Sequence, residues 1–499
     1  MELTFPKSDI GYLGRILHQQ RNAEQTQEIK LSDGMPDIGR VLACWGVPLI
    51  RGKEWGVNRI AVNAGTMVWV LYAPEDGTDP RCVESWVPFQ MEWDIRDTDR
   101  EGQIRVRPLL RFADARSLSA RKLMVRTGVA ALGEAFVPMQ AQFSLPDQAE
   151  ADIQLLKRTY PLQLQRYAGE KSFLLDEELP LPAGRPVPDK LISFSLRPEI
   201  TEQRISADRV VFKGNANLHM IYRCKEGKLH TWDFPLPFSQ LGELQESPEE
   251  DAWADVMLCA TSLEAGLEDN GHLRVKCGLL GQYTVTCRTF VELAEDAYST
   301  RREVQPQMES LELPVILENR QENLYCEQTL PQGGEAVVDV QFYPDFPRKR
   351  TSGDTVELEL PGQFQVLYYG EDGMLQSSTA RWEGNFRMNT GENTVTDAQP
   401  FLREPATAAF SGEQLLLKAN MTLDLQTRAD QEIPYAAGLE AGAPRQPDPA
   451  RPSLILRRVD SEGLWALAKK SGSTVDAIRK ANALNGEPEQ GQMLLIPVS

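Results

Sequence analysis

GTMVWVLYAPEDG, at residues 65–77, sets a pattern that recurs twice along the chain. It consists of a glycine, a short β-like run that ends in tyrosine, and an acidic-glycine turn. The same order of features recurs in GNANLHMIYRCKEGK from Gly214 and in GQFQVLYYGEDG from Gly362, at an interval of about 150 residues each time. Self-similarity at a fixed period indicates a repeated structural unit.

Two further markers keep the same period. WVPF begins at Trp86, WDFPLPF at Trp232 and WEGNF at Trp382. PDIGRVL at Pro36 and PDKLISF at Pro188 precede the first two copies, whereas the third copy has GGEAVVDV in this place. Together the markers predict three tandem copies of one module. A chain of 499 residues is also too long for a single hydrophobic core.

The module is rich in β-strand patterns. Apolar residues alternate with glutamates at Val356, Leu358 and Leu360, and a period of two is typical of a half-buried antiparallel strand. A longer alternating set is Leu415, Leu417, Ala419, Met421, Leu423 and Leu425. Acidic-glycine dipeptides suit the hairpin turns between such strands. They are Asp76-Gly77, Glu226-Gly227 and Asp372-Gly373.

The expected fold class is therefore mainly β: three tandem antiparallel β-rich repeat domains and a small C-terminal α/β domain. In repeat two, GLLG at Gly278–Gly281 is predicted to be a turn between two strands. Within the repeats, helix is expected only at Ser8–Gln27, Asp147–Tyr160 and Pro248–Cys259, and a loop is the alternative for the last of these. We expect repeats at 24–140, 170–300 and 320–440, a proline-rich linker at 441–452 and the final domain at 453–498.

The composition of the chain argues against nucleic-acid binding and membrane insertion. The formal net charge of −19 would repel nucleic acid and anionic membranes, and no apolar run is long enough for membrane insertion. The N-terminal segment does not read as a secretory signal, so we expect a cytoplasmic protein. The seven cysteines lack any Cys-x-x-Cys pair and are expected to be buried thiols: Cys44, Cys82, Cys224, Cys259, Cys277, Cys287 and Cys326.

The linker and tail have a different character. Ala436–Pro452 holds four prolines, so the tail beyond it is expected to be tethered and not packed. The tail reads as strand, helix, helix, strand. Leu454–Val459 is the first strand, Ser461 caps a helix that stops at Gly472, and Ser473 with Asp476 forms a capping box for the second helix. That helix ends at Asn485-Gly486, and Gln492–Pro497 returns as a strand.

The tail resembles a LysM domain. The resemblance rests on Leu-Trp-x-x-Ala at Leu464–Ala468, x-Gly-x-Thr-Val at Ser471–Val475, Ala-Asn-x-Leu at Ala481–Leu484 and Gly-Gln-x-Leu-x-Ile-Pro at Gly491–Pro497. One stretch departs from the family, because Val459–Leu464 is a residue shorter and lacks the usual Gly-Asp-Thr-Leu order. In the family this loop helps to line the groove for N-acetylglucosamine chains, so the departure weakens the inference of glycan binding.

The whole chain resembles the SipL family, in which SPOCS domains precede a terminal LysM domain. The resemblance implies a sporulation role in spore-coat assembly. It places the protein in the mother-cell cytoplasm and on the forespore surface. It also implies docking of the LysM domain onto the coat morphogenetic ATPase, with other coat proteins as further partners.

No local pattern predicts chemistry. The four histidines, His18, His219, His230 and His272, have no metal-ligand spacing, and no Ser-His-Asp or phosphate-loop signature occurs. We therefore expect no catalytic residue, no metal and no cofactor. His219 is interpreted as a cross-strand packing residue. The repeated aromatic pairs are interpreted as core and not as sugar platforms; they are Trp86/Phe89, Trp232/Phe238 and Trp382/Phe386.

The tail carries the candidate partner-binding surface. Trp465 is expected to be partly exposed beside Leu464, and exposed aromatics often anchor interfaces. Asn482 and a basic set extend this surface: Arg457, Arg458, Lys469, Lys470, Arg479 and Lys480. A solvated helix face remains the alternative for these charges. The expected structural residues of the domain are Leu464, Ala468, Ile478, Leu484, Gly491, Leu495, Ile496 and Pro497.

The sequence leaves three functional hypotheses. The first is a non-enzymatic scaffold or adaptor of coat assembly. The second is a peptidoglycan-binding protein of the cell wall or spore cortex, whose LysM domain grips N-acetylglucosamine glycan. The third is an enzyme with a cryptic site in a β-repeat. The lack of a secretion signal favours the adaptor over the wall protein.

Overall fold

The computed structural model describes residues 2–96, 101–146, 152–180, 184–249, 251–268, 271–444, 452–459, 463–484 and 486–498. Almost all of these residues lie in antiparallel strands, so the predicted fold class is confirmed. Within these ranges, helix is confined to α1 (Gly463–Ser471) and α2 (Val475–Ala481) in the C-terminal domain.

Unit 1, defined as β2–β7, contains two three-stranded sheets. One is the meander β3–β4–β5, and the other has the order β2–β7–β6, so that the last strand of the unit pairs with the first. The strands are β2 (Lys7–Lys30), β3 (Ile38–Gly56), β4 (Arg59–Pro74), β5 (Arg81–Asp94), β6 (Gln103–Ser119) and β7 (Lys122–Ser144).

Unit 2, defined as β8–β13, repeats this plan. Its meander is β9–β10–β11 and its second sheet has the order β8–β13–β12. The strands are β8 (Ile153–Leu179), β9 (Pro188–Ser206), β10 (Arg209–Cys224), β11 (Leu229–Glu243), β12 (Trp253–Leu267) and β13 (Leu273–Ser299).

Unit 3, defined as β14–β21, follows the same plan with two strands interrupted. β17 pairs with β18 on one side and with β15 and β16 on the other, while β21 pairs with β14, β19 and β20. The strands are β14 (Arg302–Leu330), β15 (Ala336–Pro344), β16 (Arg348–Ser352), β17 (Thr355–Tyr369), β18 (Leu375–Asn389), β19 (Thr394–Leu402), β20 (Thr407–Ser411) and β21 (Gln414–Pro444).

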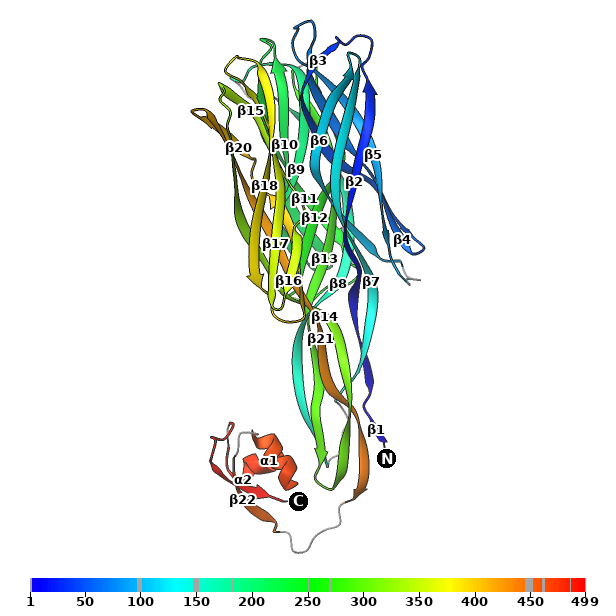
Figure 1. Cartoon of the computed structure of the whole chain (residues 1–499). Helices are drawn as coiled ribbons and strands as arrows, with labels where there is room; N and C mark the ends of the chain where they lie inside the picture. Colours follow the sequence, from blue (N-terminus) through cyan, green and yellow to red (C-terminus); the bar gives the residue numbers. More distant parts are fainter. Residues whose placement is uncertain are drawn as a thin grey trace.

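The long first and last strands of the three units come together as one stem. Figure 1 shows the hairpins β2–β7, β8–β13 and β14–β21 extending from the broad head as a narrow stem. All three hairpins supply apolar side chains to a common stem core, which therefore belongs to no single unit. Its buried members are Ile10, Phe143, Leu162, Leu164, Val291, Leu293, Leu311, Leu313, Val315, Ile433, Tyr435 and Ala437.

The start of the chain joins the stem at its far end. β1 (Glu2–Thr4) pairs antiparallel with β21, with Leu3 opposite Leu439. The expected repeat boundaries of 24, 170 and 320 fall inside the stem strands β2, β8 and β14. The division into those domains therefore remains a prediction.

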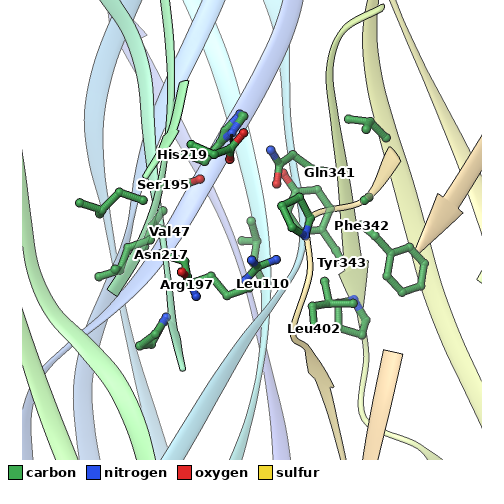
Figure 2. Close-up of a pocket in the computed structure, with 18 of the residues that line it drawn as sticks. Val47, Leu110, Ser195, Arg197, Asn217, His219, Gln341, Phe342, Tyr343 and Leu402 are labelled. Carbon is green, nitrogen blue, oxygen red and sulfur yellow. Dashed lines mark hydrogen bonds and ion pairs between the residues drawn. The ribbon is translucent and has the colours of Figure 1, made fainter. Parts of the chain in front are cut away.

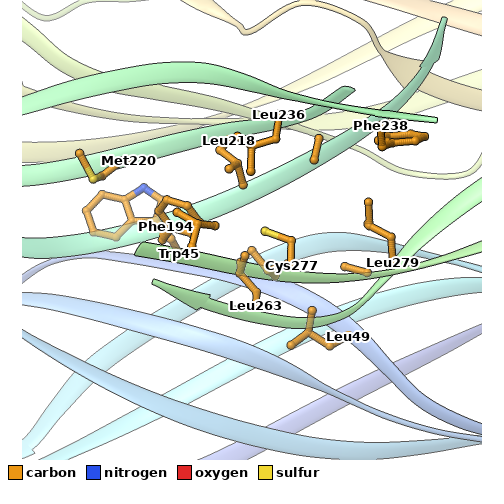
Figure 3. Close-up of a cluster of buried hydrophobic side chains, with 14 of the residues drawn as sticks. Trp45, Leu49, Phe194, Leu218, Met220, Leu236, Phe238, Leu263, Cys277 and Leu279 are labelled. Atoms are coloured by element: carbon orange, nitrogen blue, oxygen red, sulfur yellow. The ribbon is translucent and has the colours of Figure 1, made fainter. Parts of the chain in front are cut away.

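The hydrophobic core of the head is also shared between units. Figure 3 shows side chains of β10, β11 and β13 packing together with Trp45 and Leu49 of β3 from unit 1. In unit 3, Trp382 and Phe386 pack on the apolar cluster around Phe364, while Trp232 and Phe238 are buried in unit 2. The interpretation of the repeated aromatic pairs as core residues is confirmed.

The recurring glycine of each repeat lies under an aromatic ring or a neighbouring strand. A Cβ atom on Gly65 would lie 2.2 Å from the ring of Trp86, and one on Gly362 would lie 2.4 Å from Phe342. A Cβ atom on Gly214 would lie 1.9 Å from the carbonyl oxygen of Glu199. Glycine recurs at this place because the adjacent backbone and aromatic rings leave no room for a side chain.

The alternating strand from Leu415 and the three acidic-glycine turns are confirmed. The alternating set from Leu415 to Leu425 is buried throughout on one face of β21. Gly77, Gly227 and Gly373 close the turns after β4, β10 and β17 with positive φ angles of 71°, 81° and 69°. Glycine adopts this left-handed conformation without steric cost.

The three helix predictions in the repeats are wrong. Ser8–Gln27 lies in β2, and the described part of Asp147–Tyr160 leads into β8. Most of the last predicted segment, Pro248–Cys259, lies in β12 from Trp253 onward. Each of these segments finds its hydrogen-bond partner on another strand, and such tertiary pairing overrides local helix propensity.

The predicted turn at Gly278–Gly281 is also wrong. β13 runs through it without interruption, and all four residues are buried. Gly281 faces the ring of Phe212, which a Cβ atom would approach to 2.7 Å. These glycines permit close packing inside a strand and do not reverse the chain.

Candidate functional site

The C-terminal domain has the predicted order of strand, helix, helix and strand. β22 (Leu454–Arg458) pairs antiparallel with β23 (Met493–Pro497), and α1 and α2 pack on one face of this two-stranded sheet. The capping box at Ser473 is corrected, because Thr474 caps α2 and its side chain accepts a hydrogen bond from the amide of Ala477. The expected cap at Ser461 lies outside the described residues. The second helix ends earlier than predicted, because α2 stops at Ala481 with Asn482 as its C-cap and does not reach Asn485-Gly486.

The core of this domain contains most of the expected structural residues. Leu464, Ala468, Ile478 and Ile496 are buried, and Leu484 packs against them. Gly491 adopts a positive φ of 88° and its amide bonds the carbonyl oxygen of Val459. Pro497 pairs with Leu454 across the sheet. Leu495 does not lie in the core, since the alternation of β23 turns Leu494 inward in its place.

Asn482 holds α2 to β23. Its side-chain amide donates to the carbonyl oxygens of Ile478 at 2.8 Å and Leu495 at 2.6 Å, and its side-chain oxygen accepts from the amide of Leu495 at 2.8 Å. The sequence predicts Asn482 to be part of the partner-binding surface. In the structure its polar atoms instead hold α2 to β23 within the domain.

Trp465 makes its contacts within the chain. Its indole Nε1 donates to Asp296 Oδ2 at 2.8 Å, and its ring meets Tyr298 edge to face at a centroid distance of 4.8 Å. Tyr298 also donates to the carbonyl oxygen of Ser473 at 2.8 Å and belongs to the same apolar cluster as Leu464. The C-terminal domain is thus packed against the end of β13, which corrects the expectation that it is only tethered.

The predicted linker is correspondingly shorter. β21 continues to Pro444, so the first part of Ala436–Pro452 is strand. Figure 1 shows the C-terminal domain beside the lower end of the stem, near the N-terminus. We call the set Asp296, Tyr298, Trp465 and Lys469 the tail latch.

The basic residues of the tail divide into two groups. Lys469 joins the tail latch through an ion pair of 2.7 Å with Asp296, and Arg479 pairs with Glu487 at 2.7 Å within the domain. The other four are exposed: Lys470 and Lys480 on the helical side, and Arg457 and Arg458 on β22.

The outward face of the two-stranded sheet is apolar. Leu456 lies opposite Leu495 and Arg458 lies opposite Met493, so these side chains form one continuous face. We define the outer sheet face by its four exposed apolar residues: Leu454 at 50%, Leu456 at 56%, Met493 at 47% and Leu495 at 40% relative exposure. An exposed cluster of this kind, rimmed by charge, is typical of an interaction surface. Sequence reasoning missed it because it placed Leu495 in the core.

A second polar site lies among the repeats. His219 of β10 bridges two carboxylates, with Nδ1 at 2.8 Å from Asp233 and Nε2 at 2.9 Å from Asp339. Burial alone would lower the pKa of His219, but the two carboxylates raise it to about 10. His219 contacts its cross-strand neighbour Asp233, as expected, but through an ion pair, and the imidazolium also links unit 2 to Asp339 of unit 3.

A third set of charges is buried where the three units meet. The central charge cluster comprises Arg15, His18, Arg105 and Glu134 of unit 1 with Asp397 and Arg428 of unit 3. Arg105 also reaches Asp255 of unit 2 at 2.8 Å. Burial would raise the pKa of Glu134, but Arg105, His18 and Arg15 outweigh it and hold the pKa at about 2.

The described residues show no arrangement for metal chemistry. No group of three or more His, Cys, Asp or Glu side chains among them is placed to hold an ion. All seven cysteines are unpaired, and burial raises the pKa of the Cys259 thiol to about 12. Within the same part of the chain, neither helix is long and apolar enough to cross a bilayer.

Comparison with known proteins gives one match. Residues 189–264 match the family model described as SipL, SPOCS domain, which covers β9, β10, β11 and most of β12. This segment includes the repeat motif that begins at Gly214. No curated protein and no solved structure matches the chain. The match supports a SipL-like protein, and it lies wholly within unit 2.

Proposed function

We propose that this chain is a non-enzymatic adaptor of spore-coat assembly. The SPOCS match at residues 189–264 supports a sporulation role, and the tail resembles a LysM domain on the motifs from Leu464 to Pro497. In this proposal the chain works in the mother-cell cytoplasm. Its LysM-like domain docks onto the coat morphogenetic ATPase at the forespore surface, and the repeats recruit further coat proteins.

The orientation of the C-terminal domain is the observation that carries the proposal. Trp465 on α1 faces the stem, where it bonds Asp296 and contacts Tyr298. The outer sheet face points away from the domain's own core, with four apolar side chains exposed to solvent. Since desolvation of such a surface is favourable on binding, we assign it as the docking face of the adaptor.

Charge supports an acidic partner surface. Arg458 lies on the outer sheet face opposite Met493, on a chain whose formal net charge is −19. A basic patch on an acidic protein favours one orientation of approach toward an acidic partner. The exposed Lys480 of α2 adds to the positive potential of this small domain.

The competing proposal is that the tail grips peptidoglycan glycan. Sugar recognition commonly uses an exposed aromatic ring, and Trp465 is the aromatic residue of this domain. Its indole is engaged with Asp296 and Tyr298 in the tail latch. Because Trp465 already makes these contacts, binding of a protein partner at the outer sheet face is favoured over binding of a glycan at Trp465.

A paired binding experiment separates the two. The full-length protein, a variant with both Leu456→Glu and Leu495→Glu, and the control Leu174→Glu are each mixed with the purified coat morphogenetic ATPase. The control changes an equally exposed leucine of β8. We expect the wild type and the control to bind the ATPase, and the double variant to lose at least about tenfold in affinity.

The same proteins are then sedimented with insoluble peptidoglycan. Under the adaptor proposal little of any of them is retained. Strong retention of all three proteins on peptidoglycan, together with no capture of the ATPase, would establish the glycan-binding alternative.

A further inference from the structure

A cavity of about 700 Å³ lies where the three units meet in the head. Its walls come from β3 and β6 of unit 1, β9 to β12 of unit 2, and β15, β19 and β20 of unit 3. Figure 2 shows Arg197, Asn217 and His219 on one side, facing Gln341, Phe342 and Tyr343 on the other. This volume falls within the range of about 300–1,000 Å³ that is usual for small-molecule sites.

A cluster of polar groups lines one part of the cavity. Asp233 at one edge has 55% of its side chain exposed, whereas the side chain of Asp339 is 3% exposed. His219 spans the two carboxylates, and Asp339 also accepts a hydrogen bond from Trp45 Nε1 at 3.1 Å. The two carboxylates balance the charge of the imidazolium, although His219 Nε2 is buried without a hydrogen bond and meets Asp339 only as an ion pair.

Arg197 is different, because its positive charge is left without a close partner. Among the residues that the structure describes it forms no ion pair, and its Nε atom is buried without a hydrogen-bond partner. Glu199, Asp233 and Glu404 act on it only through longer-range electrostatics. Burial nevertheless lowers the pKa of Arg197. The guanidinium has therefore lost more favourable interaction with water than the three carboxylates restore.

The walls around Arg197 combine apolar and polar side chains. Val47 and Leu110 of unit 1 and Tyr343 and Leu402 of unit 3 supply apolar surface to the cavity. A guanidinium in such surroundings binds a carboxylate through charge-assisted hydrogen bonds, while the apolar walls favour a hydrophobic body on the same ligand.

We propose that this cavity binds a small organic acid, whose carboxylate pairs with Arg197 and whose ring-sized apolar body lies between Leu110, Leu402 and Tyr343. The site lies at the junction of the repeats and is separate from the docking face on the C-terminal domain. Its occupation would add a contact common to units 1, 2 and 3.

Calorimetric titration of the full-length protein with 2-naphthoate tests this proposal. The uncharged 2-naphthylmethanol is the comparison ligand, because it keeps the ring system and lacks the carboxylate. We expect one saturable site for naphthoate and at least about tenfold weaker binding of the alcohol, which corresponds to about 1.4 kcal/mol.

Variants of β9 locate the site. Arg197→Met keeps the apolar stem of the side chain and removes the charge, and we expect it to weaken naphthoate binding at least about tenfold. Arg197→Lys restores the charge without the planar fork and should recover part of the affinity. The control Arg204→Met removes an exposed arginine of the same strand and should leave binding unchanged. Circular dichroism and the melting temperature confirm that each variant is folded.

Three results would overturn the proposal. One is the absence of saturable naphthoate binding up to about 1 mM, a concentration that detects interactions as weak as about −4 kcal/mol. Another is equal affinity for the acid and the alcohol. The third is unchanged naphthoate affinity in a folded Arg197→Met variant.

Discussion

Single buried charges connect the three units of the head. Glu134 and Asp397 belong to units 1 and 3, and His18 lies between them at 3.1 Å from each. Removing one member of a buried ion-pair network leaves the others uncompensated, which is strongly destabilising. The central charge cluster therefore makes the association of the units sensitive to acid.

Glu134 gives this sensitivity a defined pH window. Its pKa falls from 4.5 in the unfolded chain to about 2 in the folded protein, so the stability that its ionisation provides is present above about pH 4.5 and lost as the pH falls to about 2. We expect Glu134→Gln to be less stable than the wild type by about 3 kcal/mol at pH 6. The difference should shrink steadily between pH 4.5 and about 2.

Urea unfolding at a series of pH values measures this difference. Glu413→Gln, an exposed change in the turn before β21, is the control and should follow the wild type at every pH. If the difference in free energy of unfolding between Glu134→Gln and the wild type stays constant down to a pH of about 2, the assigned ion pairing of Glu134 is contradicted.

The recurring glycine is a second feature at the scale of single residues. A Cβ atom at Gly214 would clash with the backbone carbonyl of Glu199, which cannot rotate away, and with the ring of Phe238 at 2.7 Å. We expect Gly214→Ala to destabilise the protein by about 1–3 kcal/mol, because strands β9 and β10 must separate. The melting temperature measures the effect.

Gly266→Ala is the matched control in the same unit. Nothing lies within 4 Å of its added Cβ atom, so its melting temperature should stay near that of the wild type. Equal melting temperatures for the two variants would show that the glycine of the repeat motif is not required by packing.

At the scale of the elements, local patterns predict some strands, such as the first part of β21, but not others, such as β2. Alternation from Leu415 to Leu425 and the turns at Gly77, Gly227 and Gly373 are local features, so the sequence reveals them. By contrast, Ser8–Gln27 is rich in residues that favour helices. It becomes a strand because it pairs with β7, whose residues lie about a hundred positions or more further along the chain, and β7 supplies its hydrogen bonds.

The tail latch is the element-scale contact that sequence reasoning could not place. The sequence predicts that Trp465 binds a partner protein, whereas the structure shows it in contact with Asp296 and Tyr298 on β13, where no local motif predicts such contacts. Asn482 is predicted to lie on the partner-binding surface and Leu495 in the core, but in the structure Asn482 braces the domain internally and Leu495 is exposed. The reason is related. The hydrogen bonds of Asn482 to β23 and the side-chain alternation of that strand depend on the folded domain.

Breaking the tail latch should release the C-terminal domain from the stem. Asp296→Ala removes the acceptor of the Trp465 indole and the partner of Lys469. We expect small-angle X-ray scattering to show a larger radius of gyration for this variant, because the domain is then held only by its linker. Asp176→Ala, which breaks an exposed pair between β8 and Arg274, should leave the radius unchanged.

An unchanged radius of gyration in Asp296→Ala would mean that the burial of Tyr298 against the C-terminal domain holds it without the polar contacts. Adding Tyr298→Ala then tests that remaining contact. If the double variant also keeps the wild-type radius, the packed arrangement of the tail is contradicted.

At the scale of the whole molecule, three units share one stem and one head core. The period of the sequence predicts three copies of one fold, yet it could not show that Leu164, Leu313 and Ile433 meet in a single stem core. It also could not show that β1 closes onto β21 at the opposite end of the chain. These contacts arise only when the repeats assemble.

This assembly gives the adaptor proposal its geometry. The tail latch fixes the C-terminal domain at the stem end, and the outer sheet face is left exposed there. The head lies at the other end of the molecule (Figure 1), and in the adaptor proposal it is the part that recruits coat proteins. One end thus suits attachment and the other suits recruitment.

Fluorescence microscopy of a full-length fusion during sporulation tests this account most directly. The wild type and the Leu174→Glu control should form a ring around the forespore, whereas the protein with Leu456→Glu and Leu495→Glu should stay diffuse in the mother cell. A ring that persists in the double variant, or diffuse fluorescence of the wild type throughout sporulation, would contradict docking through the outer sheet face.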